Sequence, residues 1–245
     1  MPTVHDLIYL NRDFRKLLET GLERASPFPP HCWPLLYLAV KIARHQEALE
    51  VLALRDFGSE GGIILRSMFE AAANILWISK DPAPRLTRFV AFLAFDSQKY
   101  RDASQKWDAM SHLSAKYRQR IEQEFEQLKK EAKQIGDEFG FKSYEHWSGL
   151  SLKTMCKEIG WLERYDFLYK TYSDVSHSNI ISSNKYLKFS ESGVRLNREP
   201  QGDECAMCLC EAYYYLWASF SFLDIFLNLG MESMLEHAYS RIPKT

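Results

Sequence analysis

Apolar residues recur at helical spacing along most of the chain. In residues 5–24 they stand at Leu7, Leu10, Phe14, Leu17 and Leu18. This spacing places them on one face of a helix, so the segment is predicted to be an amphipathic helix. The run Ser-Pro-Phe-Pro-Pro at 26–30 ends it, because proline cannot continue a helix. We expect this first helix to be an appendage of the fold.

The same pattern predicts further helices separated by glycine and proline. They are expected over about 33–57, 60–79, 84–107, 112–139, 151–159, 162–177 and 203–229, followed by a short helix. Gly58 is expected to end the second helix, and Asp81 and Pro82 the third. The segment 112–139 is highly charged and has a narrow apolar stripe, which favours a solvated arm that packs along one edge.

The segment 184–198 breaks the helical pattern. Two short runs with strand-like composition, 186–189 and 194–196, flank the turn sequence Ser-Glu-Ser-Gly. This arrangement predicts a small β-hairpin. We therefore expect an all-α, multi-helix bundle formed by one domain over 1–245, with the hairpin as an insertion.

Composition is that of an ordinary globular protein. Apolar residues make up 46% of the chain and charged residues 26%. The formal net charge is −1, so no global field draws the chain to nucleic acid or anionic lipid, although local basic patches remain open. The N-terminus has an acidic residue, Asp6, and no apolar core of a signal peptide.

The cysteines favour a reducing, cytoplasmic location. There are five of them, an odd number, and three crowd one predicted helix as Cys205-x-x-Cys208-x-Cys210. Thiolates at this spacing could bind zinc, but a closed site needs four ligands and none of the others is close in sequence. We therefore interpret these cysteines as small buried residues, and we expect no metal site and no cofactor.

The segment 206–229 is the most apolar stretch of the chain. Glu211 and Asp224 leave 12 uncharged residues between them, whereas a membrane span needs about 20. We expect a buried or interface helix and no membrane contact. Its aromatic residues cover almost every face: Tyr213, Tyr214, Tyr215, Trp217, Phe220, Phe222 and Phe226. Core packing combined with a homodimer interface explains this density best.

A polar stripe on the predicted third helix is the first candidate site. Arg66, Glu70 and Asn74 are four residues apart and share one face, with Ser67 beside them, in otherwise apolar sequence. A helix this apolar is expected to be buried, and charges are rarely buried without partners. Two interpretations stay open at this point. The stripe is either a structural Arg66–Glu70 ion pair that fixes helix register or the lining of a cleft.

The end of the predicted helix 162–177 is the second candidate. Ser173 and His177 lie one turn apart, with Lys170 and Asp174 within two turns of His177. Histidine is the usual acid–base group near neutral pH. The alternative is that Ser176, Ser178 and Asn179 merely terminate the helix, with His177 near its C-terminal dipole. A Ser-His-Asp hydrolase is disfavoured, because there is no G-x-S-x-G motif. The chain also has no phosphate-binding glycine loop and no H-E-x-x-H.

Two motifs resemble those of a known family. Leu65-Arg66-Ser67-x-x-Glu70-Ala71, followed by Trp77 and Asp81-Pro82, and later Tyr172-Ser173-x-x-x-His177, resemble an uncharacterised bacterial all-helical family. That family is similar to the HEPN (higher eukaryotes and prokaryotes nucleotide-binding) superfamily. The resemblance covers roughly residues 35–230 and is specific at these two motifs.

The resemblance implies a metal-independent ribonuclease of a bacterial defence or toxin-type system. In HEPN nucleases an arginine, four to six residues and a histidine form the motif, and two subunits bring their motifs together on RNA. Here Lys170 stands at the arginine position, so Arg66 is expected to supply the guanidinium from the neighbouring helix.

The resulting assignment gives each candidate residue a role. His177 is the acid–base group, and Arg66 and Lys170 contact phosphate. Glu70, Ser173 and Asp174 orient these groups, and Asn74 and Tyr172 complete the substrate contacts. The alternative function is a non-catalytic helical interaction module that binds a protein partner, in which Arg66, Glu70 and His177 form a buried structural network. A third hypothesis is a small-molecule pocket between the two candidate helices.

Overall fold

The computed structural model describes residues 2–106, 114–142, 146–197 and 199–242. Its α-helices are α1 (Val4–Ala25), α2 (Trp33–Ala53), α3 (Gly58–Ser79), α4 (Pro82–Lys106), α5 (Ala115–Phe139), α6 (Leu152–Glu158), α7 (Leu162–Arg164), α8 (Lys170–Ser176), α9 (Cys205–Leu227) and α10 (Glu232–Ser240). Strands β1 (Leu187–Ser190) and β2 (Gly193–Leu196) pair antiparallel as a hairpin. The prediction of an all-α fold with a small hairpin is confirmed.

The remaining segments are short. Three are 3-10 turns, namely η1 (Pro30–Cys32), η3 (Ile180–Lys185) and η4 (Gly202–Glu204), and one is a π-helical turn, η2 (Tyr165–Tyr169). The sequence predicts one continuous helix over 162–177, whereas the chain forms α7, η2 and α8 there. Since η2 carries no glycine or proline, no local signal marks it in the sequence.

Two predicted helix ends are in fact helix starts. The second helix was expected to reach residue 57 and end at Gly58, but α2 ends at Ala53 and Gly58 is the first residue of α3. Pro82 was expected to end the third helix and instead begins α4. Proline is favoured in a first helical turn, where its missing N–H has no intrahelical partner to lose.

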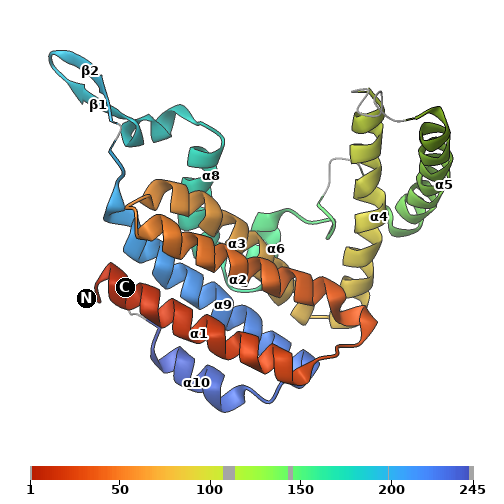
Figure 1. The fold of residues 1–245 in the computed structure, drawn as a ribbon, viewed down its shortest axis with the longest axis horizontal. Helices are drawn as coiled ribbons and strands as arrows, with labels where there is room; N and C mark the ends of the chain where they lie inside the picture. The colour runs from red at the N-terminus through yellow and green to blue at the C-terminus, as the bar shows by residue number, and fades with distance from the viewer. Residues whose placement is uncertain (1, 107–113, 143–145, 198, 243–245) are drawn as a thin grey trace. The chain divides into compact units, whose positions relative to one another are not determined.

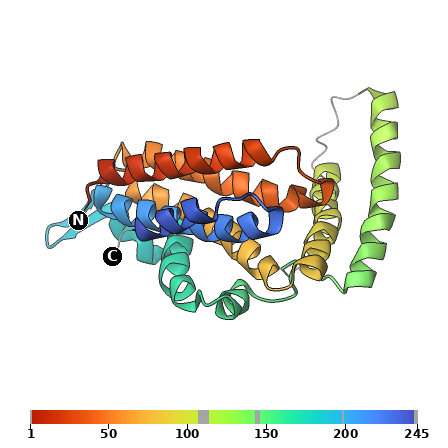
Figure 2. The same ribbon diagram turned by 90° about the horizontal axis from the view of Figure 1, so that it is seen from below.

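The chain divides into two compact units. The first consists of Met1–Ser79 and Cys156–Thr245, and the second of Lys80–Met155. In the first, α1, α2, α3 and α9 lie side by side, and α10 packs on α9 (Figures 1 and 2). The prediction of a single domain over 1–245 stays a prediction.

The second unit is built from α4, α5 and the segments that follow α5. The guanidinium of Arg88 donates to the carbonyl oxygens of Trp147 and Phe139, at 2.7 and 2.8 Å, and lies over the ring of Phe141. The predicted arm over 112–139 is described from residue 114 onward, and α5 packs along α4. Residues 107–113 lie outside the described residues.

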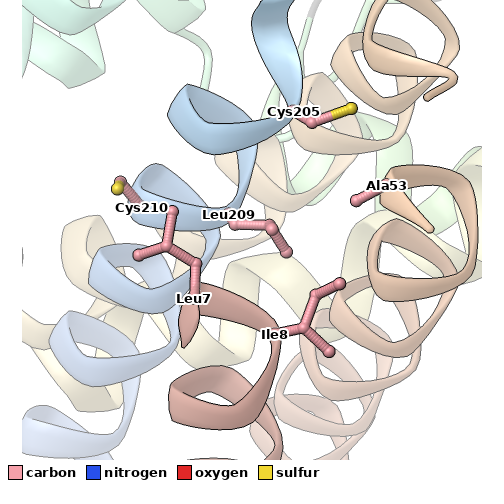
Figure 3. Close-up of a cluster of buried hydrophobic side chains, with 6 residues drawn as sticks. All are labelled: Leu7, Ile8, Ala53, Cys205, Leu209 and Cys210. Carbon is pink, nitrogen blue, oxygen red and sulfur yellow. The ribbon is translucent and has the colours of Figure 1, made fainter. Parts of the chain in front are cut away.

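Helix α1 belongs to the core of the first unit. It was expected to be an appendage, but its apolar face packs on α2 and α9 (Figure 3). The buried cluster at this junction consists of Leu7, Ile8, Ala53, Cys205, Leu209 and Cys210. The correction has a simple cause, because an amphipathic helix left beside the fold would expose its apolar stripe to water.

A buried ion pair joins α1 to α2. The Glu50 side chain is 3% exposed, and its carboxylate accepts from Arg15 at 2.5 Å and from Arg12 at 3.4 Å. Buried charges need such partners, since desolvation costs several kcal/mol per ion.

The aromatic helix predicted over 203–229 is α9. Tyr213, Tyr215 and Phe220 are at most 1% exposed, so core packing accounts for them. Their role in a dimer interface stays a prediction. Among the described residues one helix, α3, is long and apolar enough to cross a membrane, and 61% of its most apolar stretch is buried in the bundle. This burial is that of a core helix.

Candidate functional site

A glycine in α3 allows α8 to approach closely. A Cβ atom at Gly62 would lie 1.9 Å from Cδ1 of the Tyr172 ring, a distance at which no side chain fits. The ring of Tyr172 therefore rests on the backbone of α3, and its hydroxyl reaches Sγ of Cys208 on α9 at 3.5 Å. Tyr172 is 1% exposed. It was predicted to contact substrate, and in the structure it instead holds α8 in place.

Arg66 joins α3 to the segment formed by η2 and α8. Its Nη1 donates to Oγ of Ser176 at 2.5 Å, and its Nη2 donates to the Tyr169 hydroxyl at 3.2 Å. Nη2 also lies 3.3 Å from Oε1 of Glu70, one turn further along α3. The predicted Arg66–Glu70 pair is therefore present, and it is part of a larger network.

Tyr169 is the centre of this network. Its hydroxyl accepts from Arg66 and donates to Oε1 of Glu70 at 3.0 Å, and its ring lies under the Arg66 guanidinium at 5.1 Å. Burial raises the pKa of Tyr169, so the hydroxyl keeps its proton at neutral pH. The residue ends the π-helical turn η2, and such turns are frequent at functional sites.

The polar stripe is the half-buried face of α3 and extends from α8 to α2. Ser67 contacts Nε2 of His45 on α2, with 3.1 Å between Oγ and the ring nitrogen. Asn74 is also half-buried. The stripe is neither sealed in the core nor fully open, and of the two sequence interpretations the ion pair is realised. No cavity described in the structure is lined by Arg66 or Glu70.

His177 is exposed and caps the C-terminus of α8. Its backbone N–H donates to the carbonyl oxygen of Ser173 at 3.0 Å. Within the described part of the chain, no hydrogen bond or ion pair joins its imidazole to Arg66 or Glu70. The closest link is through the chain, because His177 follows Ser176, the acceptor of Arg66. The alternative hypothesis placed Arg66, Glu70 and His177 in one buried network. It is wrong for His177, which is exposed and lies outside the network.

The other predicted site residues on α8 have partners of their own. Nζ of Lys170 lies 2.6 Å from Oδ1 of Asp166 on the surface, and this hydrogen bond raises the pKa of Lys170. Oδ1 of Asp174 accepts from Nδ2 of Asn179 at 2.9 Å rather than contacting His177. Ser173 takes part through its carbonyl oxygen, which accepts from His177 and from the Ser176 hydroxyl.

The cysteines of α9 are buried thiols. Burial raises the pKa of Cys208 to about 12 and that of Cys205 and Cys210 to about 11. Such thiols stay protonated at neutral pH and are weak nucleophiles and metal ligands. The interpretation of these cysteines as small buried residues is confirmed by their exposure of 9% or less.

Sequence reasoning missed four residues of this region: Gly62, His45, Tyr169 and Ser176. Gly62 could have been found, because the pair Gly61-Gly62 lies inside a predicted helix and glycine there indicates close packing. The other three offered none, because histidine, tyrosine and serine are compatible with any half-exposed helical position.

The two largest described cavities lie elsewhere in the first unit. One of about 640 Å³ is bordered by α9 and α10, with Trp217, Asp224 and Tyr239 among its lining residues. The other, about 580 Å³, is a groove along α2 whose lining includes His45. The hypothesis of a small-molecule pocket between α3 and α8 therefore lacks a described cavity.

Comparison with protein-family models identifies the family. Residues 33–194, about two thirds of the chain, match the model of a family of unknown function, DUF5677. The chain belongs to this family. The DUF5677 match runs from the start of α2 into β2 and contains every candidate site residue. Neither the search of curated proteins nor that of solved structures gave a match.

Proposed function

We propose that this DUF5677 member is a HEPN-like, metal-independent endoribonuclease of a bacterial defence or toxin-type system, working in the cytoplasm. The observation that carries the proposal is the position of His177. Its imidazole is exposed at the end of α8, and the residue before it accepts a hydrogen bond from Arg66. An acid–base group and a guanidinium thus belong to adjoining segments, although they do not touch.

The reaction needs two proton transfers and stabilisation of negative charge. One imidazole takes the proton of an RNA 2′-hydroxyl, and the oxygen attacks the neighbouring phosphorus. The bond from phosphorus to the 5′-oxygen breaks, a second imidazole protonates that oxygen, and a 2′,3′-cyclic phosphate remains. Cationic side chains stabilise the charge that develops on the phosphate oxygens.

Lys170 is the first phosphate contact in this proposal. It lies seven residues before His177, so both are on the same face of the segment. Its ion pair with Asp166 is solvent-exposed and is worth little, so phosphate can displace the carboxylate. Arg66 is the second contact, and its Nε is buried with no hydrogen-bond partner among the described residues. Glu70 and Tyr169 hold Arg66 in position.

A second subunit supplies the second imidazole, and the hairpin is the surface we assign to it. Leu187, Phe189, Val194 and Leu196 share one hairpin face because they are cross-strand partners, and the last three are 63%, 59% and 65% exposed. An isolated two-stranded hairpin is only marginally stable in water, so a covered apolar face is expected. The hairpin begins ten residues after His177, and we propose it as a dimer surface in addition to the aromatic helix α9.

The test is incubation of the purified protein with structured and unstructured RNA in the presence of EDTA. Wild-type protein should cleave RNA to products with 2′,3′-cyclic phosphate ends, and His177→Ala should lose this activity. His237→Ala is the matched control, because His237 is an exposed histidine on α10. An absence of cleavage of every RNA tried, at high protein concentration, sinks the proposal, as does equal activity of the two histidine variants.

One observation favours a second candidate, a non-catalytic interaction module. The polar atoms of Arg66, Glu70, Tyr169 and Ser176 bind one another, as in a structural brace. In that case wild-type protein cleaves no RNA, yet Arg66→Ala still lowers the melting temperature, because Tyr169 and Ser176 lose a charged donor. An unchanged melting temperature contradicts the brace.

A further inference from the structure

A shallow groove runs along the outer face of α2 and carries two exposed aromatic rings. Its volume is about 580 Å³. Trp33 and Tyr37 line it and are 46% and 54% exposed. The rings lie one helical turn apart, so they project in nearly the same direction.

Two cations line the same groove. Lys41 follows Tyr37 by one turn, and Arg44 is three residues further on. None of the described lining residues is acidic, and the two carboxylates of α2 take no part in the lining, since Glu50 is buried against Arg15 and Glu47 lies outside it. Along one face of α2, the two rings are therefore followed by the two positive charges. From Trp33 to Arg44 this face is about 17 Å long, at 1.5 Å per residue.

One lining residue of the groove contacts the polar stripe of α3. His45 contacts Ser67, the residue next to Arg66 in the sequence. Burial, with a smaller effect of the nearby Lys41, lowers the pKa of His45, so its ring is neutral at neutral pH and binds through hydrogen bonds alone. The surface from Trp33 to Ser67 belongs to the first unit throughout.

We propose that the α2 groove binds single-stranded RNA, with Trp33 and Tyr37 stacked on bases and Lys41 and Arg44 against phosphates. The inference rests on the proposed function, since the bound strand would be the substrate that reaches His177. Aromatic rings beside a positive groove are the usual means of binding single strands. A second copy fits less well, because a symmetric contact would place one positively charged groove against another, with no carboxylate in the lining of either.

The experiment measures binding separately from cleavage. A fluorescein-labelled 2′-O-methyl oligouridylate of about 12 nucleotides lies within the usual site sizes of roughly 4–16 nucleotides. It has no free 2′-hydroxyl and cannot be cleaved by the proposed reaction. Fluorescence anisotropy with the full-length wild-type chain gives the dissociation constant over a range of salt concentrations.

The double variant Tyr37→Ala/Lys41→Ala should bind roughly five- to 150-fold more weakly from the loss of one stacked base alone. The slope of log affinity against log salt should also fall by about 0.7 for the lost charge. Tyr9→Ala/Lys16→Ala is the matched control, since both residues are exposed on α1 and seven positions apart. The control should bind like wild type.

Three results overturn the inference: no binding by wild-type protein, equal weakening in both double variants, or a loss of dimer in the α2 variant with unchanged RNA binding. The last result would assign the groove to a second copy. If the protein binds RNA through α2 but cleaves no RNA, the result supports RNA binding by the groove and contradicts the proposed ribonuclease activity. If the wild-type protein cleaves RNA and the α2 variants bind RNA normally, the result supports the ribonuclease activity and contradicts RNA binding by the groove.

Discussion

The position of α8, and with it the position of His177, depends on a missing side chain at residue 62. The ring of Tyr172 occupies the space that a Cβ atom would fill. Interiors are packed too densely to absorb such an overlap without moving a ring or a helix. The glycine is therefore a structural requirement of the candidate site although it touches no substrate.

Gly62→Ala should lower the free energy of unfolding by about 3 kcal/mol, the upper part of the range for overpacking. The neighbouring Gly61→Ala is the matched control. Its Cβ would lie 3.1 Å from the side-chain end of Leu49 and, at an ordinary contact distance of 3.9 Å, from Sγ of Cys208. Alanine also favours the helix by up to about 1 kcal/mol. Urea denaturation of both variants measures the difference, and equal effects would contradict the packing argument.

Buried thiols make stability depend on pH in the alkaline range. Burial raises the pKa of Cys208 to about 12, from 9.0 for an unperturbed thiol. The folded state therefore binds this proton more tightly than the unfolded state. Its contribution is complete below the pKa of the unfolded thiol and is lost as pH rises toward the pKa of the folded one.

Cys208→Ala should be less stable than wild type at pH 8, and the difference in the free energy of unfolding should narrow by roughly 1 kcal/mol at pH 10. The wild-type chain loses the contribution of the thiol in this range, whereas the variant has none to lose. Urea denaturation under reducing conditions at both pH values measures the gap. A gap that stays constant with pH would show that this thiol does not titrate as proposed.

At the scale of elements, the sequence predicted which segments are helical but not how they begin and end. Helical periodicity located α1, α2, α3 and α9, because an apolar face must be buried. Gly58 and Pro82 were assigned to the wrong ends, since both residues are also compatible with a first helical turn. The π-helical turn η2 was not predicted, because it carries no glycine or proline that would mark it in the local sequence.

The docking of α1 rests on a charge as well as on apolar contacts. Glu50→Ala should destabilise the chain by about 3–5 kcal/mol, because Arg15 is left buried without its carboxylate. Glu19→Ala is the matched control, since Glu19 also faces Arg15, at 3.8 Å, but is 56% exposed. It should change the melting temperature little. Thermal unfolding followed by circular dichroism compares the two, and a small effect of Glu50→Ala would mean that apolar packing alone holds α1.

At the scale of the whole molecule, the candidate site shows what one sequence can and cannot reveal. Arg66 and Glu70 stood out because they are charges among apolar neighbours. Their partner Ser176 lies 110 residues beyond Arg66, and no pattern in the chain connects the two. Membership of an uncharacterised family was predicted and is confirmed. The two motifs that suggested it, and the HEPN likeness, stay proposals.

The proposed dimer makes a prediction with a control on the same hairpin. Phe189→Ser/Val194→Ser should convert the dimer to a monomer with little change in melting temperature, because both side chains are exposed in the single chain. Lys188→Ser/Arg195→Ser alters the opposite face, where these two residues pair, and should leave the dimer intact. Sedimentation velocity measures the oligomeric state, and a wild-type monomer at high concentration would remove the dimer from the proposal.

The division of the chain also has a consequence for the order of folding. The second unit, Lys80–Met155, separates α3 from the segments that cover it. During synthesis α1, α2 and α3 therefore emerge well before Tyr172 and α9 can bury their apolar faces. Loop-closure entropy grows slowly with length, by about 0.6 kcal/mol per doubling, so the detour costs little stability. The long connection instead slows folding. We expect the contacts of α3 with α8 and α9 to form late, after helices that are neighbours in the sequence have paired.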